Sequence, residues 1–375
     1  MTTDLYFIFA LFAVALVLGI VLNALRDRLR VGKPRAISPS SMSISMVVPA
    51  RDAASTIVPL LQDLHAQDLD KERIEVIVVD DHSGDGTDRL AQGMCARWPQ
   101  LRVLRNSGVG KKAAITTGVH AARHGVILLT DADARVGPMR SRMVVEAMEQ
   151  QGADLMVLPV RTIGQGGLGR LQEEEQAGLT GLAVGAASSG WPSLASGANL
   201  AFSRQAFLDC GGYDGDTYTS GDDVFLVQRM RKAGKRIGGY FHLDVVVTVE
   251  AEHTWRGFWA QRLRWAGKMR GVQGTWPWFG SLTLLLPWAL LWLTVRLDPR
   301  DLLEADGVEV LVFLLLGWSL WLVPAVNLTT TVRRAFHLRT WPLVTAMCFL
   351  LFTIYAPLIA VAALIHRPRW KGRPT

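Results

Sequence analysis

The chain has 375 residues, half of them hydrophobic, and a formal net charge of +7 at pH 7. Its mean hydropathy of +0.22 is too apolar for an ordinary soluble enzyme, so the composition argues against a purely soluble protein. The three cysteines have neither disulfide nor metal-site spacing, which fits a reducing compartment. They are Cys95, Cys210 and Cys348.

The apolar excess lies at the two ends of the sequence. Residues 5–25 carry no charge and are about as long as a helix that crosses a bilayer, so we predict a transmembrane anchor. No basic stretch precedes them and no small-residue cleavage pattern follows, which favours an anchor over a cleaved signal peptide. Three further spans are predicted at 279–295, 310–328 and 343–365, with Trp276, Trp278, Trp341 and Trp370 at their borders.

Basic residues indicate the orientation of these spans. By the positive-inside rule, those that follow the first span place the region after it in the cytoplasm. They are Arg26, Arg28, Arg30, Lys33 and Arg35.

The C-terminal tail does not fit this rule if all three later spans cross. It would end outside although it carries Arg367, Arg369, Lys371 and Arg373. We therefore consider that the last segment bends back at Pro357, or that 279–295, interrupted by Pro287, lies in the interface. Of these topologies we favour one with a cytoplasmic tail.

Strands and helices alternate between these end regions. Short β-branched runs predict buried strands, and apolar residues at helical spacing predict the helices between them. This alternation predicts an α/β fold with a mainly parallel sheet flanked by helices. The predicted strands are residues 44–48, 75–79, 101–104, 126–129 and 153–160, and the predicted helices are 53–67, 88–98, 111–120 and 168–181.

Two acids, Asp131 and Asp133, follow the apolar strand 126–129. Ligands of open α/β sheets bind at the carboxyl ends of the strands. Divalent cations such as Mg²⁺ prefer carboxylate oxygens and hold phosphates through one or two of them. We interpret Asp131-Ala-Asp133 as a metal and diphosphate site, although a lone Asp-x-Asp also suits an Asp-rich turn.

Two other predicted strands also end in polar residues. The first is followed by Arg51 and the second by Asp80 and Asp81, so we expect these side chains in one crevice with Asp131. Neither a dinucleotide fingerprint nor a Walker loop is present. Asp81 can accept a hydrogen bond from a base, and Arg51 and Lys111 can neutralise phosphate oxygens. Each cation alone also suits a solvated surface.

Two later segments complete the candidate site. Asp222 and Asp223 begin an amphipathic helix. Helix capping accounts for one of the two acids and gives no structural role to the other. Residues 253–270 are dense in Trp and Arg, which is also typical of an interfacial anchor before a span. Surface or structural roles are predicted for 173–175, three glutamates in a row, and for His253.

In this order the motifs resemble those of the membrane-bound family 2 inverting glycosyltransferases. This family includes cellulose, chitin and hyaluronan synthases and ceramide glucosyltransferase-like enzymes, and the resemblance covers roughly residues 43–270. The motifs are Pro49-Ala-Arg51, Val79-Asp80-Asp81-x-Ser83-x-Asp85-x-Thr87, Gly110-Lys111, Asp131-x-Asp133, Gly221-Asp222-Asp223 and Gln261-x-x-Arg264-Trp265.

The resemblance implies a GT-A fold, a nucleotide diphosphate sugar, most often a UDP-sugar, and Mg²⁺ or Mn²⁺. It also implies roles for individual residues. Family members often have Glu-Asp where this chain has Asp222-Asp223, and the second position, the general base, is the same. By this resemblance, Asp81 contacts the base, and Asp131 and Asp133 bind the nucleotide and the metal, while Pro49, Arg51 and Lys111 lie in the motifs on the nucleotide side. Asp223 is the general base. The site is closed over diphosphate and acceptor by Gln261, Arg264 and Trp265.

The predicted spans and the resemblance together divide the chain into five parts. These are an N-terminal transmembrane anchor (1–30), a cytoplasmic GT-A domain (43–252), an interfacial segment (253–275), C-terminal transmembrane segments (276–366) and a basic tail (367–375).

The predicted function is a metal-dependent inverting glycosyltransferase of the cell membrane that glycosylates a lipid or lipid-linked acceptor. A processive polysaccharide synthase remains open, although the small number of spans puts a self-contained export channel in doubt. A catalytically inactive nucleotide-sugar-binding membrane protein and a metal-dependent phosphohydrolase also remain open. Nucleic acid is not an expected partner, because the basic patches lie beside the membrane segments.

Overall fold

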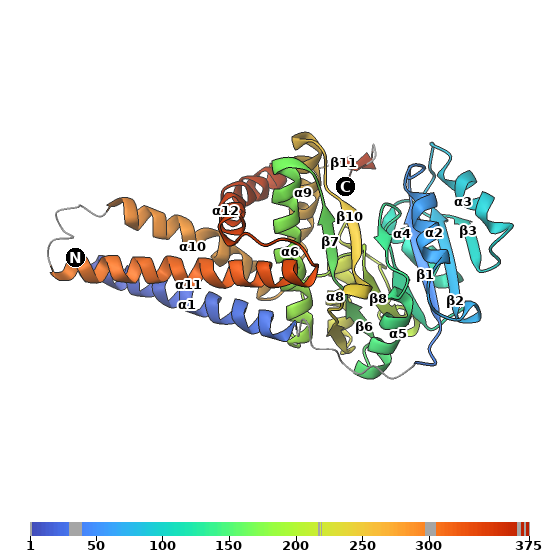
Figure 1. The fold of residues 1–375 in the computed structure, drawn as a ribbon, viewed down its shortest axis with the longest axis horizontal. Helices are drawn as coiled ribbons and strands as arrows, with labels where there is room; N and C mark the ends of the chain where they lie inside the picture. The colour runs from blue at the N-terminus through green and yellow to red at the C-terminus, as the bar shows by residue number, and fades with distance from the viewer. Residues whose placement is uncertain are drawn as a thin grey trace.

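A computed structural model describes residues 2–29, 40–216, 218, 220–296, 305–365, 369–370 and 373–374. Most of the segment between the predicted anchor and the predicted domain lies outside the described residues, with Arg30, Lys33 and Arg35 in it, and so does most of the predicted basic tail at 367–375. Figure 1 shows an α/β domain beside an elongated group of helices, with α6 (Gly166–Ser188) between them.

The domain is built on a seven-stranded sheet of order β3-β2-β1-β4-β8-β6-β9. All neighbouring strands are parallel except β8, which is antiparallel to both β4 and β6. The mainly parallel sheet predicted from the sequence is therefore confirmed. The strands are β1 (Ile44–Ala50), β2 (Ile74–Asp80), β3 (Leu101–Arg105), β4 (Val126–Leu129), β6 (Leu155–Val157), β8 (Leu200–Ser203) and β9 (Ile237–Gly239).

The central strands are buried on both faces because helices cover the sheet on either side. Val47 of β1 packs in the same cluster as residues of α4 (Lys111–Ala121), such as Ile115. Its neighbours Met46 and Val48 point to the opposite face and cluster with α2 (Ile57–His65). The remaining helices of the domain are α3 (Thr87–Cys95), α5 (Arg140–Gln151), α7 (Arg204–Asp209) and α8 (Asp222–Lys232), with short 3-10 helices at Lys71–Arg73 and Leu243–Val245.

The predicted strand at 153–160 is wrong as a single element. It forms two strands in different sheets, β6 and β7 (Val160–Ile163), with Pro159 between them. Proline has no N–H for a ladder hydrogen bond, which explains the break. β7 pairs in parallel with β10 (Val247–Glu250), and β10 pairs antiparallel with β5 (Arg135–Val136). Helix α6 follows β7 of this small sheet directly along the chain.

Helix α6 is longer than the predicted 168–181 and joins the domain to the apolar helices. A Cβ at Gly185 would lie 2.7 Å from the backbone oxygen of Leu25, and one at Gly181 would lie 2.9 Å from Cδ1 of Leu328. Because glycine has no side chain, α6 packs directly on α1 (Thr2–Arg28) and α11 (Ala305–Ala335).

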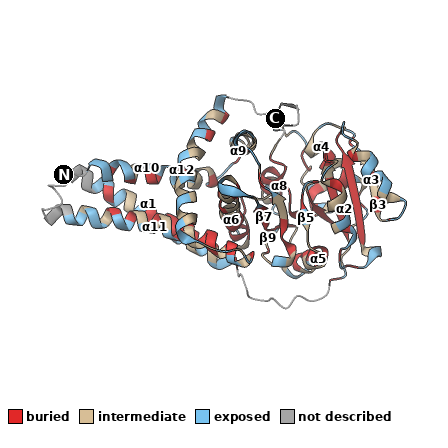
Figure 2. Cartoon of the chain, turned by 45° about the horizontal axis from the view of Figure 1, so that its top comes forward, coloured by how far each residue is buried: buried red, intermediate tan, exposed pale blue. Residues whose placement is uncertain are grey.

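Four helices in the described part of the chain are long and apolar enough to cross a membrane. They are α1, α10 (Trp276–Arg296), α11 and α12 (Pro342–Ile365), and the four predicted spans fall on them. Figure 2 shows extensive exposed surface on these helices, whereas red dominates the strands of the domain. In Figures 1 and 2, α12 lies across the domain end of the other three instead of running alongside them.

Candidate active site

One cavity of about 1110 Å³ has all of the predicted site residues in its wall. It begins at the carboxyl ends of β1, β2 and β4 and continues past α8, α6 and α9 (Trp255–Met269) to the apolar helices. Residues that the sequence separates by more than 200 positions therefore face one space. The predicted site residues in this wall are Pro49, Arg51, Asp81, Lys111, Asp131, Asp133, Asp222, Asp223, Gln261, Arg264 and Trp265.

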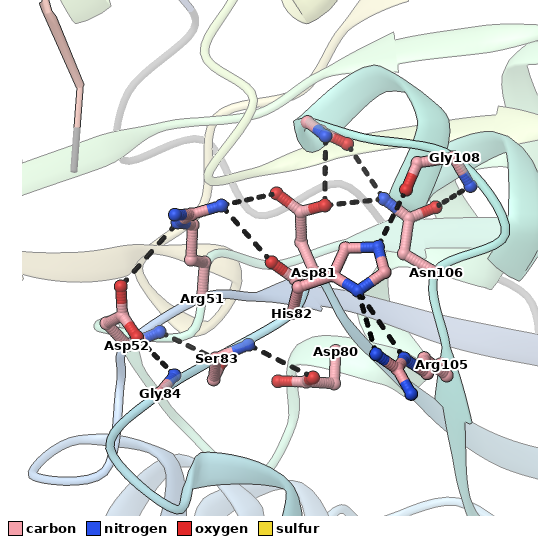
Figure 3. A network of polar contacts seen from close by, with 11 residues as sticks. Arg51, Asp52, Asp80, Asp81, His82, Ser83, Gly84, Arg105, Asn106 and Gly108 are labelled. Atoms are coloured by element: carbon pink, nitrogen blue, oxygen red, sulfur yellow. Dashed lines mark hydrogen bonds and ion pairs between the residues drawn. The ribbon is translucent and has the colours of Figure 1, made fainter. Parts of the chain in front are cut away.

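Asp81 lies almost completely buried just after β2, and polar contacts fix its carboxylate (Figure 3). Its Oδ1 accepts hydrogen bonds from Asn106 Nδ2 at 2.7 Å and from the backbone N–H of Gly110 at 2.9 Å. Arg51 Nη1 lies 3.6 Å from Oδ2 on the other side. A carboxylate held in this way is ready to receive a donor from a planar base.

Lys111, at the start of α4, joins two carboxylates from different elements. Its Nζ lies 2.7 Å from Oδ1 of Asp131 and 3.0 Å from Oδ2 of Asp222. A Cβ at Gly197 would collide with both Asp222 Oδ2 and Lys111 Nζ, so this close arrangement requires glycine there. The sequence predicts Lys111 only as a residue that neutralises phosphate. In the structure it also pairs with Asp131 and Asp222.

This triad shifts the pKa values of all three groups. Burial lowers the pKa of Lys111, but the charges of Asp131 and Asp222 outweigh burial and raise it above its ordinary value. Burial raises the pKa of Asp131, and Lys111 offsets only part of that rise because Asp133 and Asp222 repel additional negative charge. Burial also acts to raise the pKa of Asp222, but attraction to Lys111 and Lys268 lowers it. Lys111 therefore stays protonated as the counter-ion of the pair.

Asp131 and Asp133 fit a Mg²⁺ or Mn²⁺ ion that also binds phosphate. Asp133 is exposed in the cavity wall, and only Asp131 Oδ1 is paired with Lys111. Within the described residues, no group of three or more His, Cys, Asp or Glu side chains converges on a point. Mg²⁺ commonly takes one or two carboxylates and completes its shell with phosphate oxygens and water, so two acids suffice.

Asp223 follows Asp222 in the first turn of α8 and is paired differently. Lys268 of α9 donates to both of its oxygens, with Nζ 2.9 Å from each. The side chains of Lys268 and Asp223 are 15% and 9% exposed. Asp222 and Asp223 therefore have separate lysine counter-ions, one from α4 and one from α9.

Helix α9 is held over the cavity by a second, deeper ion pair. Arg262 Nη2 lies 2.5 Å from Glu175 Oε2 of α6, and both side chains are only 6% exposed. The Arg262 guanidinium also lies 4.6 Å from the Trp265 ring centroid. Among the described residues, Arg264 forms no hydrogen bond or ion pair; burial lowers its pKa, and the charge of Glu252 offsets part of that fall. An arginine that lines the cavity and forms no ion pair with a described residue can bind a diphosphate.

Five further residues belong to the site although the sequence motifs do not indicate them: Asn106, Glu175, Gly197, Arg262 and Lys268. Lys268 could have been found, because it lies four and seven residues after Arg264 and Gln261 and so on the same helix face. The glutamates were assigned to surface or structural roles, and the contact of Glu175 with α9 crosses 87 positions. Only the packing of α6 against α9 reveals it.

Beyond these polar groups the cavity continues as an apolar arm among α10, α11, α12 and α6. Its wall is mostly aliphatic and aromatic, with occasional hydroxyl groups such as those of Thr283 and Thr329. A single space thus connects carboxylates and cations with side chains of the candidate membrane helices. We define the apolar arm by Phe279, Leu284, Leu328, Phe349, Phe352 and Ile359.

Residues 45–210 match the family model Glycosyl transferase family 2. The chain is 27% identical over 233 residues to the probable glycosyltransferase YdaM of Bacillus subtilis, covering 60% of this chain and 54% of that protein. It is 28% identical over 254 residues to a beta-monoglucosyldiacylglycerol synthase of Synechocystis, covering 63% and 50%. The matched part thus spans about half the length of these curated relatives.

Among solved structures, the chain is similar to the mannosyltransferase PcManGT from Pyrobaculum calidifontis, which was determined in complex with GDP-Man and Mn²⁺. The TM-score is 0.54 at 21% identity, with 92% of this chain and 99% of that chain covered. At this identity the likeness concerns the fold. The domain has the GT-A-like α/β fold that the sequence predicted.

Proposed function

From the premise that the chain contains a glycosyl transferase family 2 domain, we propose that it is a membrane-anchored, metal-dependent inverting glycosyltransferase. It transfers a sugar from a nucleotide diphosphate sugar, most often a UDP-sugar in this family, to a hydroxyl group of a lipid or lipid-linked acceptor. The observation that carries this proposal is the continuous cavity from Asp81 and Asp131 to the apolar arm. A donor with charged phosphates suits one end, and an acceptor with a hydrocarbon chain suits the other.

The donor occupies the strand ends in this proposal. Asp81 binds the base, and Arg51 and Lys111 lie where phosphate charge arrives. Lys111 also keeps Asp131 and Asp222 from repelling the incoming phosphates, since it lies between the two carboxylates. Mg²⁺ or Mn²⁺ held by Asp131 and Asp133 would supply Lewis-acid stabilisation of the leaving diphosphate.

The chemical step is a single displacement. The acceptor oxygen forms a bond to the anomeric carbon while the bond from that carbon to the diphosphate oxygen breaks, and the hydroxyl proton passes to Asp223. General-base catalysis of this kind contributes about 10²–10⁴-fold. Arg264, which lines the cavity and forms no ion pair with another described residue, pairs with the departing diphosphate. Trp265 and Gln261 close the site beside the sugar.

One relative supports a lipid acceptor. It is named a beta-monoglucosyldiacylglycerol synthase, and this name describes a glucosylated lipid as the product. The apolar arm lies among the candidate membrane helices, where an acyl or prenyl chain could enter from the bilayer. A lipid-like acceptor therefore agrees with both observations.

The proposed location is the cell membrane, with the domain and the tail in the cytoplasm. The crossing orientation of α12 supports this topology, because a helix at the domain end of the group need not carry the chain to the other side (Figures 1 and 2). A tag after residue 375 should then be accessible from the same side as a tag in an exposed loop of the domain. Accessibility from opposite sides would contradict it.

Product analysis tests the function. Purified full-length protein is incubated with UDP-sugars or GDP-mannose, Mn²⁺ and native lipid extract, and products are identified by mass. One added sugar on a lipid supports the proposal, whereas a ladder of chain lengths indicates a processive polysaccharide synthase. Free sugar phosphate indicates a phosphohydrolase. If calorimetry detects nucleotide-sugar binding but no product forms, the result indicates a catalytically inactive binding protein.

A further inference from the structure

Lys268 is the residue of α9 that reaches the proposed general base. Its ammonium group donates to Oδ1 and Oδ2 of Asp223 at equal distances of 2.9 Å. No other carboxylate of the described residues forms an ion pair with Lys268. The contact therefore joins α9 to the first turn of α8 at the point where the acceptor hydroxyl must arrive.

This contact restricts access to the base. A hydroxyl group that gives its proton to Asp223 has to approach a carboxylate oxygen to about 2.6–3.2 Å. Both oxygens already accept from Lys268, so the hydroxyl must share or displace the ammonium. The pair is only slightly exposed, and separating partly buried opposite charges is unfavourable. A nucleophile therefore needs binding energy from elsewhere to reach Asp223.

The acceptor can supply this energy and water cannot. A hydrocarbon chain in the apolar arm would contact Leu328, Phe349 and Phe352, which line the same cavity as Lys268. Binding energy from parts of a substrate remote from the reacting centre can drive a change at that centre. We propose, on the basis of the proposed function, that Lys268 keeps Asp223 from activating water until the acceptor is bound.

Lys268 is then a specificity-determining residue that selects transfer over hydrolysis. In hydrolysis a water oxygen bonds to the anomeric carbon, the bond to the diphosphate oxygen breaks, and the water proton passes to Asp223. The products are free sugar and nucleoside diphosphate. Transfer follows the same bond changes with the acceptor hydroxyl as nucleophile, so the two reactions differ only in which hydroxyl reaches Asp223.

The experiment compares wild type, Lys268→Met and Lys268→Arg as full-length proteins in lipid nanodiscs. Release of free sugar from the nucleotide sugar and transfer to native lipid extract are measured with Mn²⁺ present. Removing a hydrogen-bonded charge from Asp223 should raise the ratio of hydrolysis to transfer about tenfold in Lys268→Met. Lys268→Arg keeps the positive charge and should restore a low ratio.

Lys235→Met serves as the matched control. Lys235 also pairs with an aspartate, Asp209, but neither lines the cavity. Its ratio should equal that of wild type. The double variant Lys268→Met with Asp223→Asn should lose the added hydrolysis, because the proton acceptor is gone.

An unchanged or lower ratio in Lys268→Met overturns the proposal while the proposed function stands, provided that wild type glycosylates lipid. Hydrolysis that persists in the double variant overturns it as well, since water would then be activated by another group. If Lys268→Met does not give a monodisperse protein, Lys268→Gln takes its place with the same expected ratio. A wild type that turns over no nucleotide sugar instead contradicts the proposed function.

Discussion

The cavity has two walls of different origin. The strand wall consists of Pro49, Arg51, Asp81, Asp131 and Asp133, which lie at or shortly after the carboxyl ends of parallel strands of one sheet. The helix wall comes from α6, α8, α9 and α12, whose contacts join distant parts of the chain. Sheet geometry alone brings the first group together. The second group depends on tertiary packing. The two walls should therefore respond differently to substitution: the strand wall through donor binding, and the helix wall through its own stability, the chemical step and acceptor binding.

The largest expected effect is at Asp223 in the helix wall. Asp223→Asn keeps the shape of the side chain but removes its basicity, so kcat should fall about 10²–10⁴-fold while donor affinity stays near that of wild type. Steady-state transfer assays and calorimetry with a nucleotide sugar measure the two quantities. Asp214→Asn, an exposed aspartate eight residues before α8, is the matched control. Full activity in a well-folded Asp223→Asn protein would refute the assignment of the base.

A smaller loss is expected in the strand wall. Asp133→Ala should weaken Mn²⁺-dependent donor binding and lower transfer about 100-fold, because a metal helps to stabilise the leaving charge. The side chain is exposed, so folding should be little affected. Asp70→Ala, 77% exposed in its side chain and outside the cavity, should retain wild-type activity. Unchanged Mn²⁺ titration of Asp133→Ala would remove this residue from the metal site.

The same contrast explains what the sequence could predict. β4 is uniformly apolar, and Asp131 and Asp133 come shortly after it, so both its burial and the position of the two acids follow from the local pattern. The roles of Arg262 and Lys268 do not follow in this way, because each depends on a carboxylate from a helix elsewhere in the sequence. The break between β6 and β7 could have been predicted from the local sequence, because Pro159 lies between the two strands. The lengthening of α6 reflects packing on α1 and α11 that no local pattern encodes.

The helix wall should depend on one buried ion pair for its stability. Glu175→Gln leaves the Arg262 guanidinium buried without its counter-ion, which should lower the free energy of unfolding by about 3–5 kcal/mol. Thermal unfolding in detergent measures this loss. Transfer should fall in parallel, because Trp265 lies on α9 next to Arg262. Replacing both Glu175 and Arg262 by Met should recover most of the stability.

An exposed ion pair provides the control for this measurement. Asp209→Asn breaks the contact with Lys235 on the domain surface and should leave the unfolding temperature unchanged. Equal stability of Glu175→Gln and wild type would mean that α9 is held mainly by its apolar contacts with α12.

The smallest effect distinguishes the walls most directly. Phe352 and Leu351 are neighbours on α12, but Phe352 lines the apolar arm whereas Leu351 is 49% exposed on the outer surface. Phe352→Ala removes apolar contact with the acceptor chain, so the KM for the lipid acceptor should rise about 3- to 10-fold. The KM for the nucleotide sugar should stay unchanged, because the donor lies at the strand ends. Leu351→Ala should alter neither constant, and a rise in donor KM with Phe352→Ala would show that the two walls do not act separately.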